Sequence, residues 1–471
     1  MTSNPPDDWD WDRVAAAIDR VGGIYRDFMV GLGERPVAPI VDREALRSMF
    51  RGSIQDVGIG IDGVLTEIER DVLPNAMSTP HPCYVGLVNS SPLPAAPLSD
   101  LVVSMLNNNS GAFHQSPPAT AAEEEVVRAF AEVLDYPGET GLLLPGGTFA
   151  NLHGLILART RHFPDWRQRG PTGIDRPRVY TSTAAHFSVA RTAHVLGIGE
   201  DNVVAIPTLG RGTIDTSALA AHIASDRKNG ATPFAVVATI GTTGTGAIDD
   251  VQAVAEICRK EELWLHVDAC YGGAAALLEE RRRDFEDLAA ADSVAVDPHK
   301  WFFLPIAAGM VLTRHPNIEH ETFGIDVAYI PTGAEPEAFF RSLPTSRRGS
   351  GLTVWATLRA HGWNPIRDAV RRNIDQMRQL EELLARAGFR VLPDGSMSIA
   401  CARFEPVGAS AEATDELQRN IAKRVIDSGT AWFSTTQHDG LVWLRFNVVN
   451  LYTRPEHIER IAAATIAAAK S

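Results

Sequence analysis

One lysine of this chain lies in surroundings that suit a nucleophilic amine. Only five of the 44 lysine and arginine residues are lysines, and four of these lie in polar or terminal segments. Lys300 instead follows the apolar run 293–296 and precedes Trp301, Phe302 and Phe303. Burial lowers the pKa of an amine and favours its neutral form, which Schiff-base chemistry needs. An equally weighted alternative is a lysine whose stem covers the end of a sheet while its amine stays in water.

A carboxylate and a glycine-rich turn accompany this lysine. Asp268 ends the apolar run 263–267, where it can pair with a protonated ring nitrogen or cap the next turn. Gly147 and Thr148 follow the run 142–144 and open a helical pattern, so backbone N–H groups and the helix dipole can bind a phosphate there. The turn is not a Walker loop, because the chain has no Gly-Lys dipeptide. A plain tight turn is the alternative.

Two more polar residues lie at the ends of apolar runs. His186 follows the run 179–181, and a neutral imidazole can stack on a ring or hold a proton, although a lone histidine is more often structural. Thr239 lies at the end of the run 235–240. Each signal is weak alone, but their order along the chain is hard to assemble by chance.

The elements that must position these residues form an α/β fold. Short apolar runs alternate with helical stretches between residues 140 and 315, which predicts a mostly parallel sheet buried between helices. Ligands of such sheets bind beyond the carboxyl ends of the strands. The expected strands are 142–144, 179–181, 203–206, 235–240, 263–267, 294–296 and 310–312.

The flanking segments predict the rest of the architecture. Amphipathic helices are expected at 9–31, 43–71 and 364–387, a proline-rich non-helical connector at 74–97 and a loop at 324–351. We expect three parts, which are an N-terminal helical arm with connector, a large α/β domain and a small C-terminal α+β domain. Their expected bounds are 1–93, 94–352 and 353–471.

Composition narrows the function classes. The 471-residue chain has a net charge of −14 and no basic runs, which disfavours nucleic acid and anionic membranes as partners. The four cysteines lack metal-ligand spacing, so no metal site is expected. There is no signal-peptide pattern and no run of about 18 apolar residues, so we expect a cytoplasmic protein.

The motifs together resemble one family. The segments 296–301, 266–269 and 186–189 are similar to those of the group II pyridoxal-dependent decarboxylases, which include aromatic-L-amino-acid, glutamate, diaminobutyrate and archaeal tyrosine decarboxylases. The resemblance extends from about His81 to Asn447. It implies the fold-type I transferase fold, pyridoxal 5'-phosphate (PLP) as cofactor, an amino-acid substrate, and a homodimer whose active sites lie between the subunits.

The resemblance also implies roles for individual residues. Lys300 would form the aldimine with PLP, Asp268 would pair with the pyridine nitrogen, and His186 would stack on the ring. Further cofactor contacts would come from Gly147, Thr148, Thr239, Cys270, His299 and, across the subunit interface, Ser350. Substrate contacts would come from His81, Ser90, Asn109, Phe339 and Phe340.

Two departures from the family pattern bear on the reaction. The segment 87–90 lacks the large rings of the aromatic decarboxylases, which argues against a catechol or indole substrate. Phe339 and Phe340 lie near the place of the loop tyrosine that protonates Cα, whereas Tyr329 matches a different tyrosine. Without a phenol at Cα, the carbanionic quinonoid would live longer and could meet O2. The alternatives are protonation by Tyr329, His186 or water.

Three functions follow from these observations. The first is removal of the α-carboxylate of an L-amino acid to give an amine. The second is decarboxylation followed by oxidation to an aldehyde with O2. The third is a non-catalytic protein that has kept the fold, which the complete set of Lys300, Asp268, His186 and Thr148 disfavours.

Overall fold

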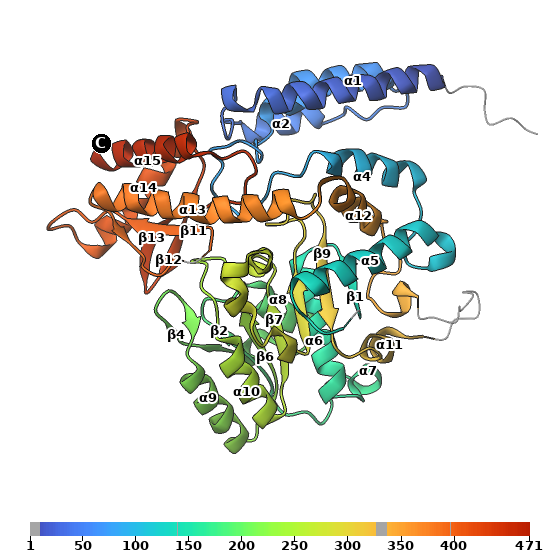
Figure 1. Cartoon of the computed structure of the whole chain (residues 1–471), viewed down its shortest axis with the longest axis vertical. Helices are drawn as coiled ribbons and strands as arrows, with labels where there is room; N and C mark the ends of the chain where they lie inside the picture. The colour runs from blue at the N-terminus through green and yellow to red at the C-terminus, as the bar shows by residue number, and fades with distance from the viewer. Residues whose placement is uncertain (1–9, 139, 326–336, 396) are drawn as a thin grey trace, which may run out of the picture.

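The structure is a computed structural model, and it describes residues 10–138, 140–325, 337–395 and 397–471. Figure 1 shows a central sheet enclosed by helices, with the N-terminal helices lying across one side of the molecule and the C-terminal helices next to them. Among the described residues, no helix combines the length and apolarity of a membrane span.

The central sheet has seven strands, and all seven predicted apolar runs are strands of it. β9 is antiparallel to its neighbours β1 and β8, and the other pairs are parallel, so the prediction of a mostly parallel α/β sheet is confirmed. In sheet order the strands are β1 (Thr140–Leu144), β9 (Gly309–Thr313), β8 (Ser293–Val296), β7 (Trp264–Asp268), β6 (Thr232–Thr239), β2 (Pro177–Ser182) and β3 (Val203–Ile206).

Helices with one apolar face bury this sheet. In α10 (Val251–Glu261) the buried residues Val251, Val254, Ala255 and Cys258 recur at helical spacing, and the Asp250 side chain caps the first turn by accepting from the Ala253 N–H. The other helices and the hairpin of this region are α6 (Gly147–His162), α7 (Trp166–Arg169), α8 (Ser188–Val195), α9 (Thr216–Lys228), α11 (Ile318–Phe323), β4 (Thr208–Leu209) and β5 (Thr213–Ile214).

A second, antiparallel sheet lies in the C-terminal part. Its order is β10 (Arg390–Val391), β11 (Ile399–Arg403), β13 (Leu441–Asn447) and β12 (Ser434–His438). The predicted helix 364–387 is α13 (Asn364–Arg386), which packs with β11 and α15. The helices beside this sheet are α13, α14 (Ala411–Asp427) and α15 (Pro455–Lys470).

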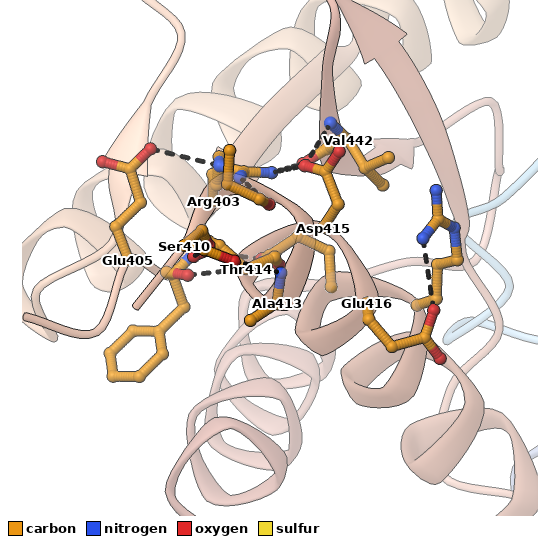
Figure 2. Close-up of polar contacts among 12 residues, drawn as sticks. Arg403, Glu405, Ser410, Ala413, Thr414, Asp415, Glu416 and Val442 are labelled. Carbon is orange, nitrogen blue, oxygen red and sulfur yellow. Dashed lines mark hydrogen bonds and ion pairs between the residues drawn. The ribbon is translucent and has the colours of Figure 1, made fainter. Parts of the chain in front are cut away.

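A buried arginine joins β11 to its neighbours. Arg403 donates from Nε to Glu405 (3.1 Å) and from Nη1 to Asp415 (2.5 Å) and the Val442 carbonyl, as Figure 2 shows. The same carboxylate of Asp415, on α14, accepts from the Val442 N–H at 2.9 Å. This network holds α14 against the sheet, and its polar groups are satisfied by each other.

The N-terminal part is helical, as predicted, but the expected helix 43–71 is interrupted. It consists of α2 (Arg43–Phe50), a break, and α3 (Gly60–Glu67) with a π-helical turn to Val72. The break contains Gly52 at φ near +72°, and α3 begins at Gly60, whose φ near +73° also lies outside the helical region. The remaining helices are α1 (Trp11–Val30), α4 (Ala95–Leu106), α5 (Pro117–Val133) and α12 (Ser350–His361), and α12 packs against α4 and α5.

Candidate active site

The predicted catalytic residues meet at the carboxyl edge of the central sheet. Asp268 is the last residue of β7 and lies opposite Thr239 of β6 in the parallel register. On the other side β8 ends at Val296, and the turn that follows carries Asp297 and Lys300. Strand ends of a parallel sheet meet at one edge, which brings residues distant in sequence into one site.

Lys300 forms an ion pair that the sequence analysis did not predict. Its Nζ lies 2.9 Å from Oδ2 of Asp297, and the two side chains are 21% and 1% exposed. Burial by itself lowers the pKa of Lys300, but the carboxylates of Asp297 and Asp268 raise it by more, so the pKa stands above its ordinary value. The expectation of a lowered pKa is therefore wrong, because spacing alone did not show that Asp297 faces the amine.

Asp268 is a buried anion with hydrogen bonds to both oxygens. Oδ2 accepts from Asn151 Nδ2 at 2.9 Å, and Oδ1 accepts from the Cys270 N–H at 3.1 Å. Burial raises the pKa of Asp268, whereas Lys300 and the Asn151 hydrogen bond lower it by more. A carboxylate in this state can keep a ring nitrogen protonated.

His186 is half-buried just after β2 and precedes α8. Its Nδ1 accepts from the Ser188 N–H at 3.3 Å, which leaves Nε2 to carry the proton of a neutral ring. Burial lowers its pKa, and the charges of Asp268 and Lys300 act on it in opposite directions. The imidazole is therefore neutral near pH 7. Because the charges of Asp268 and Lys300 act on its pKa, we assign His186 to the same site as these two residues.

Glycine is required in the turn from β1 to α6. A Cβ at Gly147 would lie 2.4 Å from Oδ2 of Asp297, and one at Gly309 of β9 would lie 2.4 Å from the Gly146 carbonyl carbon. The turn therefore packs directly against Asp297 in the Lys300 segment. The first N–H groups of α6 have no acceptor within the helix and can bind an anion. Next to it, His299 Nδ1 lies 2.7 Å from the Ala308 carbonyl oxygen and 3.2 Å from the Ala308 nitrogen.

These residues fit PLP. The buried oxygens Thr239 Oγ1 and Asp297 Oδ1 have no hydrogen-bond partner in the described structure, which is rare unless a ligand or water supplies one. The donor set matches the chemistry of the cofactor, because Lys300 offers an amine to its aldehyde, Asp268 an anion to its ring nitrogen, and the start of α6 N–H donors to its phosphate.

Some of the residues predicted to contact substrate or cofactor lie close to Lys300 and the turn from β1 to α6. Ser90 Oγ donates to the His299 carbonyl at 2.9 Å, which joins the segment 87–90 to the Lys300 turn. Cys270 is buried beside Gly147, since a Cβ added to Gly147 would lie 2.7 Å from the Cys270 Sγ. Ser350 lines a cavity of about 270 Å³ together with Pro145 and Ala307, at the outer side of the phosphate turn.

Other predicted residues gather elsewhere. Asn109 Oδ1 accepts from the N–H groups of Gly111 and Arg347 at 2.9 Å each, and the Phe339 N–H donates to the Gly111 carbonyl. Phe340 packs against Phe339, with ring centroids 4.4 Å apart. These residues form a cluster at the end of the 326–336 segment. Tyr329 lies outside the described residues.

His81 faces a different neighbourhood. It is 2% exposed, and its Nδ1 accepts from the Cys83 N–H at 2.9 Å. Burial, together with the cations Arg460 and His457 of α15, lowers its pKa to about 4. Its described hydrogen bonds lie within the segment 78–84 and reach Asn450, whose Nδ2 donates to the His81 carbonyl at 3.0 Å.

Three residues of the site were not predicted. Asn151 and Asp297 touch Asp268 and Lys300 directly. Asn151 lies one helical turn after Gly147 and Asp297 one turn before Lys300, but this spacing alone did not single them out. Arg445 of β13 is 3% exposed and has no acidic partner among the described residues. No sequence motif marks it.

The fold and site define a PLP-binding α/β enzyme, and comparisons with known proteins define its family. The model of the pyridoxal-dependent decarboxylase conserved domain matches residues 44–404. The chain is 30% identical to aromatic-L-amino-acid decarboxylase of Bacillus atrophaeus, covering 92% of this chain and 91% of that protein. It is 31% identical to L-2,4-diaminobutyrate decarboxylase of Rhizobium meliloti (strain 1021), covering 88% and 84%.

Solved structures agree in fold. Oryza sativa TDC, solved with PLP and tryptamine, superimposes with a TM-score of 0.92 at 24% identity, covering 98% of this chain and 99% of that chain. Mouse CSAD gives a TM-score of 0.91 at 24% identity, with the same coverage. The chain belongs to the pyridoxal-dependent decarboxylase family and is a PLP-dependent amino-acid carboxy-lyase.

Proposed function

We propose that the enzyme removes the α-carboxylate of an L-amino acid other than a simple aromatic one and returns the amine. The observation that carries this proposal is the segment 87–90, which Ser90 ties to the Lys300 turn and which contains no aromatic ring. Leu87, Val88 and Asn89 leave no flat apolar wall on which a catechol or indole would stack.

Each residue of the site has a separate role in this proposal. PLP, when bound, supplies a sink for the electrons of the broken Cα–carboxylate bond. With the cofactor bound, Lys300 would hold it through its amine, Asp268 would keep a proton at its ring nitrogen, and His186 would stack on its ring. Its phosphate would be bound by Gly147, Thr148, His299 and, across a subunit interface, Ser350, and Thr239 and Cys270 would make further contacts with the cofactor.

Arg445 is the proposed anchor for the carboxylate of the substrate. Its Nε donates to the Thr243 carbonyl at 2.7 Å and its Nη1 to the Gly86 carbonyl, whereas the buried Nη2 has no partner in the described structure. Both carbonyls belong to segments that adjoin the site. Gly86 precedes Ser90 in the chain, and Thr243 follows Thr239. A buried guanidinium without an acidic partner is costly, and a bound carboxylate would offset that cost.

The test is a substrate screen that follows CO2 release and O2 consumption together. L-2,4-diaminobutyrate, L-glutamate, L-aspartate and cysteine sulfinate should be compared with L-tryptophan, L-tyrosine and L-DOPA. We expect the best kcat/KM for a non-aromatic substrate, with equal yields of CO2 and amine. A best kcat/KM for an aromatic amino acid would refute the proposal.

A second candidate function is decarboxylation coupled to oxidation. The observation that favours it is that the buried residues Phe339 and Phe340 carry no phenol. In that reaction the amino acid, O2 and water give the aldehyde, CO2, ammonia and hydrogen peroxide in equal amounts. Strict anaerobiosis should then abolish aldehyde formation. Unchanged amine formation without oxygen uptake would rule it out.

We also propose a cytoplasmic homodimer with active sites at the interface. The support is a series of exposed apolar side chains in the N-terminal part of the chain, among them Trp11 (71%), Val30 (82%), Ile54 (97%) and Met105 (74%). The four cysteines are all buried and free, as suits a reducing compartment. Light scattering of the purified enzyme would test the dimer.

A further inference from the structure

A chain of hydrogen bonds runs through the core and ends on Asp268. Trp264 Nε1 donates to Ser293 Oγ at 2.9 Å, and Ser293 Oγ lies 2.8 Å from His266 Nδ1. His266 Nε2 lies 2.9 Å from Asn151 Oδ1, and Asn151 Nδ2 donates to Asp268 Oδ2 at 2.9 Å. The chain thus connects an indole on one strand with the catalytic carboxylate on the same strand by way of β8 and α6.

The carboxylate end of the chain permits only one arrangement of protons for a neutral His266. An indole N–H can only donate, so Ser293 Oγ accepts from Trp264, and its own proton is available for His266 Nδ1. An ionised carboxylate can only accept, so the NH2 of Asn151 faces Asp268 and its carbonyl oxygen faces His266. His266 must therefore be the neutral Nε2–H tautomer, and every donor in the chain points toward Asp268.

The surroundings hold this arrangement in place. His266 and Ser293 are fully buried, and Asn151 and Trp264 are 1% and 2% exposed. Burial lowers the pKa of His266 to about 4, so its ring is neutral near pH 7. A Cβ at Gly154 of α6 would lie 2.4 Å from His266 Nδ1, so the helix packs against the ring and stops it from turning. No water is needed to complete the chain.

We propose that Trp264, Ser293, His266 and Asn151 are positioning residues that keep Asp268 ionised and correctly oriented toward the ring nitrogen of PLP. Asn151 is the one member that touches Asp268, and its NH2 also donates to Ser188 Oγ at 2.9 Å. The remaining lone pairs of the carboxylate are free for the cofactor. The inference rests on the family assignment and on the proposed role of Asp268, and it is independent of which amino acid is the substrate.

The first test reads the tautomer of His266 without the cofactor. In apoprotein labelled with ¹⁵N-histidine, NMR should show the proton of His266 on Nε2 near pH 7.5. A proton on Nδ1 would reverse the chain and overturn the proposal. In Asn151→Leu no amide oxygen accepts from Nε2, so the ¹⁵N signals of His266 should move toward an average of the two tautomers.

The second test measures the affinity of the apoprotein for PLP by fluorescence titration. Asn151→Leu should weaken binding about 10- to 100-fold, the loss expected for a hydrogen bond to a buried charge. Trp264→Phe should weaken it less, by up to about 10-fold. The matched control is Trp443→Phe, because Trp443 is 1% exposed and its Nε1 has no partner in the described structure.

The paired indole variants keep the proposal falsifiable. Both lose one buried indole N–H and keep an aromatic ring, so a purely structural effect should move the two alike. Thermal unfolding of the apoproteins identifies any variant that fails to fold. If Trp264→Phe and Trp443→Phe bind PLP equally and the His266 tautomer is unchanged in Asn151→Leu, the proposed positioning role is wrong. Failure of the substrate screen would leave both readouts unaffected.

Discussion

Replacing Asp297 by asparagine should make Lys300 a faster nucleophile in the apoprotein. The carboxylate lies 2.9 Å from the amine and is 1% exposed. At an effective dielectric constant of about 20 the bare attraction is ~6 kcal/mol, but most of it is offset by the cost of removing both charges from water. A net value of about 1.5–3 kcal/mol, typical of charged hydrogen bonds, corresponds to ~1–2 pKa units.

The assay is the rate at which apoprotein combines with PLP, followed by stopped-flow absorbance from about pH 7 to pH 10. Only the neutral amine attacks the aldehyde, so Asp297→Asn should react about 10- to 100-fold faster at pH 8. Asp226→Asn is the control, since Asp226 pairs with Arg178 away from the site. Rate profiles of wild type and Asp297→Asn that coincide would refute the reasoning.

The same ion pair has a consequence for stability. The folded-state pKa of Lys300 is raised, so its contribution to stability is complete below the unfolded pKa of about 10.4 and is lost as the pH rises through the folded pKa. The difference in unfolding free energy between wild-type apoprotein and Asp297→Asn should therefore be larger at pH 8 than at pH 11. Urea titrations at the two pH values measure this.

Three further substitutions test other parts of the site. Gly147→Ala places a Cβ 2.4 Å from Asp297 and should weaken PLP binding without preventing folding, as a titration of the apoprotein would show. Arg341→Met leaves the buried carboxylate of Glu319 without its cation and should lower the unfolding free energy by about 3–5 kcal/mol, measured in urea. Arg445→Met should raise KM for the amino acid more than it lowers kcat, and equal loss in both would contradict the anchor role.

The sheet was predictable because each of its strands contains a short, mainly apolar run. Buried parallel strands need no polar face, so composition alone marks them. The prediction of one helix over 43–71 was wrong. This segment buries little surface in the described chain, and hydrophobic periodicity alone could not show that the backbone around Gly52 is not helical.

The site was predictable only where a residue's role depends on its place at a strand end. Asp268 and Lys300 could be found this way because the sheet dictates their position. Asn151 and Arg445 depend on contacts made across α6 and between two sheets, and no local pattern encodes such contacts. The pKa of Lys300 was predicted with the wrong sign for the same reason, because burial was visible in the sequence and the neighbouring carboxylate of Asp297 was not.

Asp268 and Asp297 show why residue type alone does not define a role here. Both are buried aspartates at the ends of neighbouring strands. Asp268 accepts hydrogen bonds at both oxygens, one from the amide of Asn151, and this environment stabilises one charged state. Asp297 has one oxygen paired with Lys300 and one without a partner. The first carboxylate is therefore fixed before the cofactor binds, whereas the second must exchange its contacts when Lys300 becomes bonded to the cofactor.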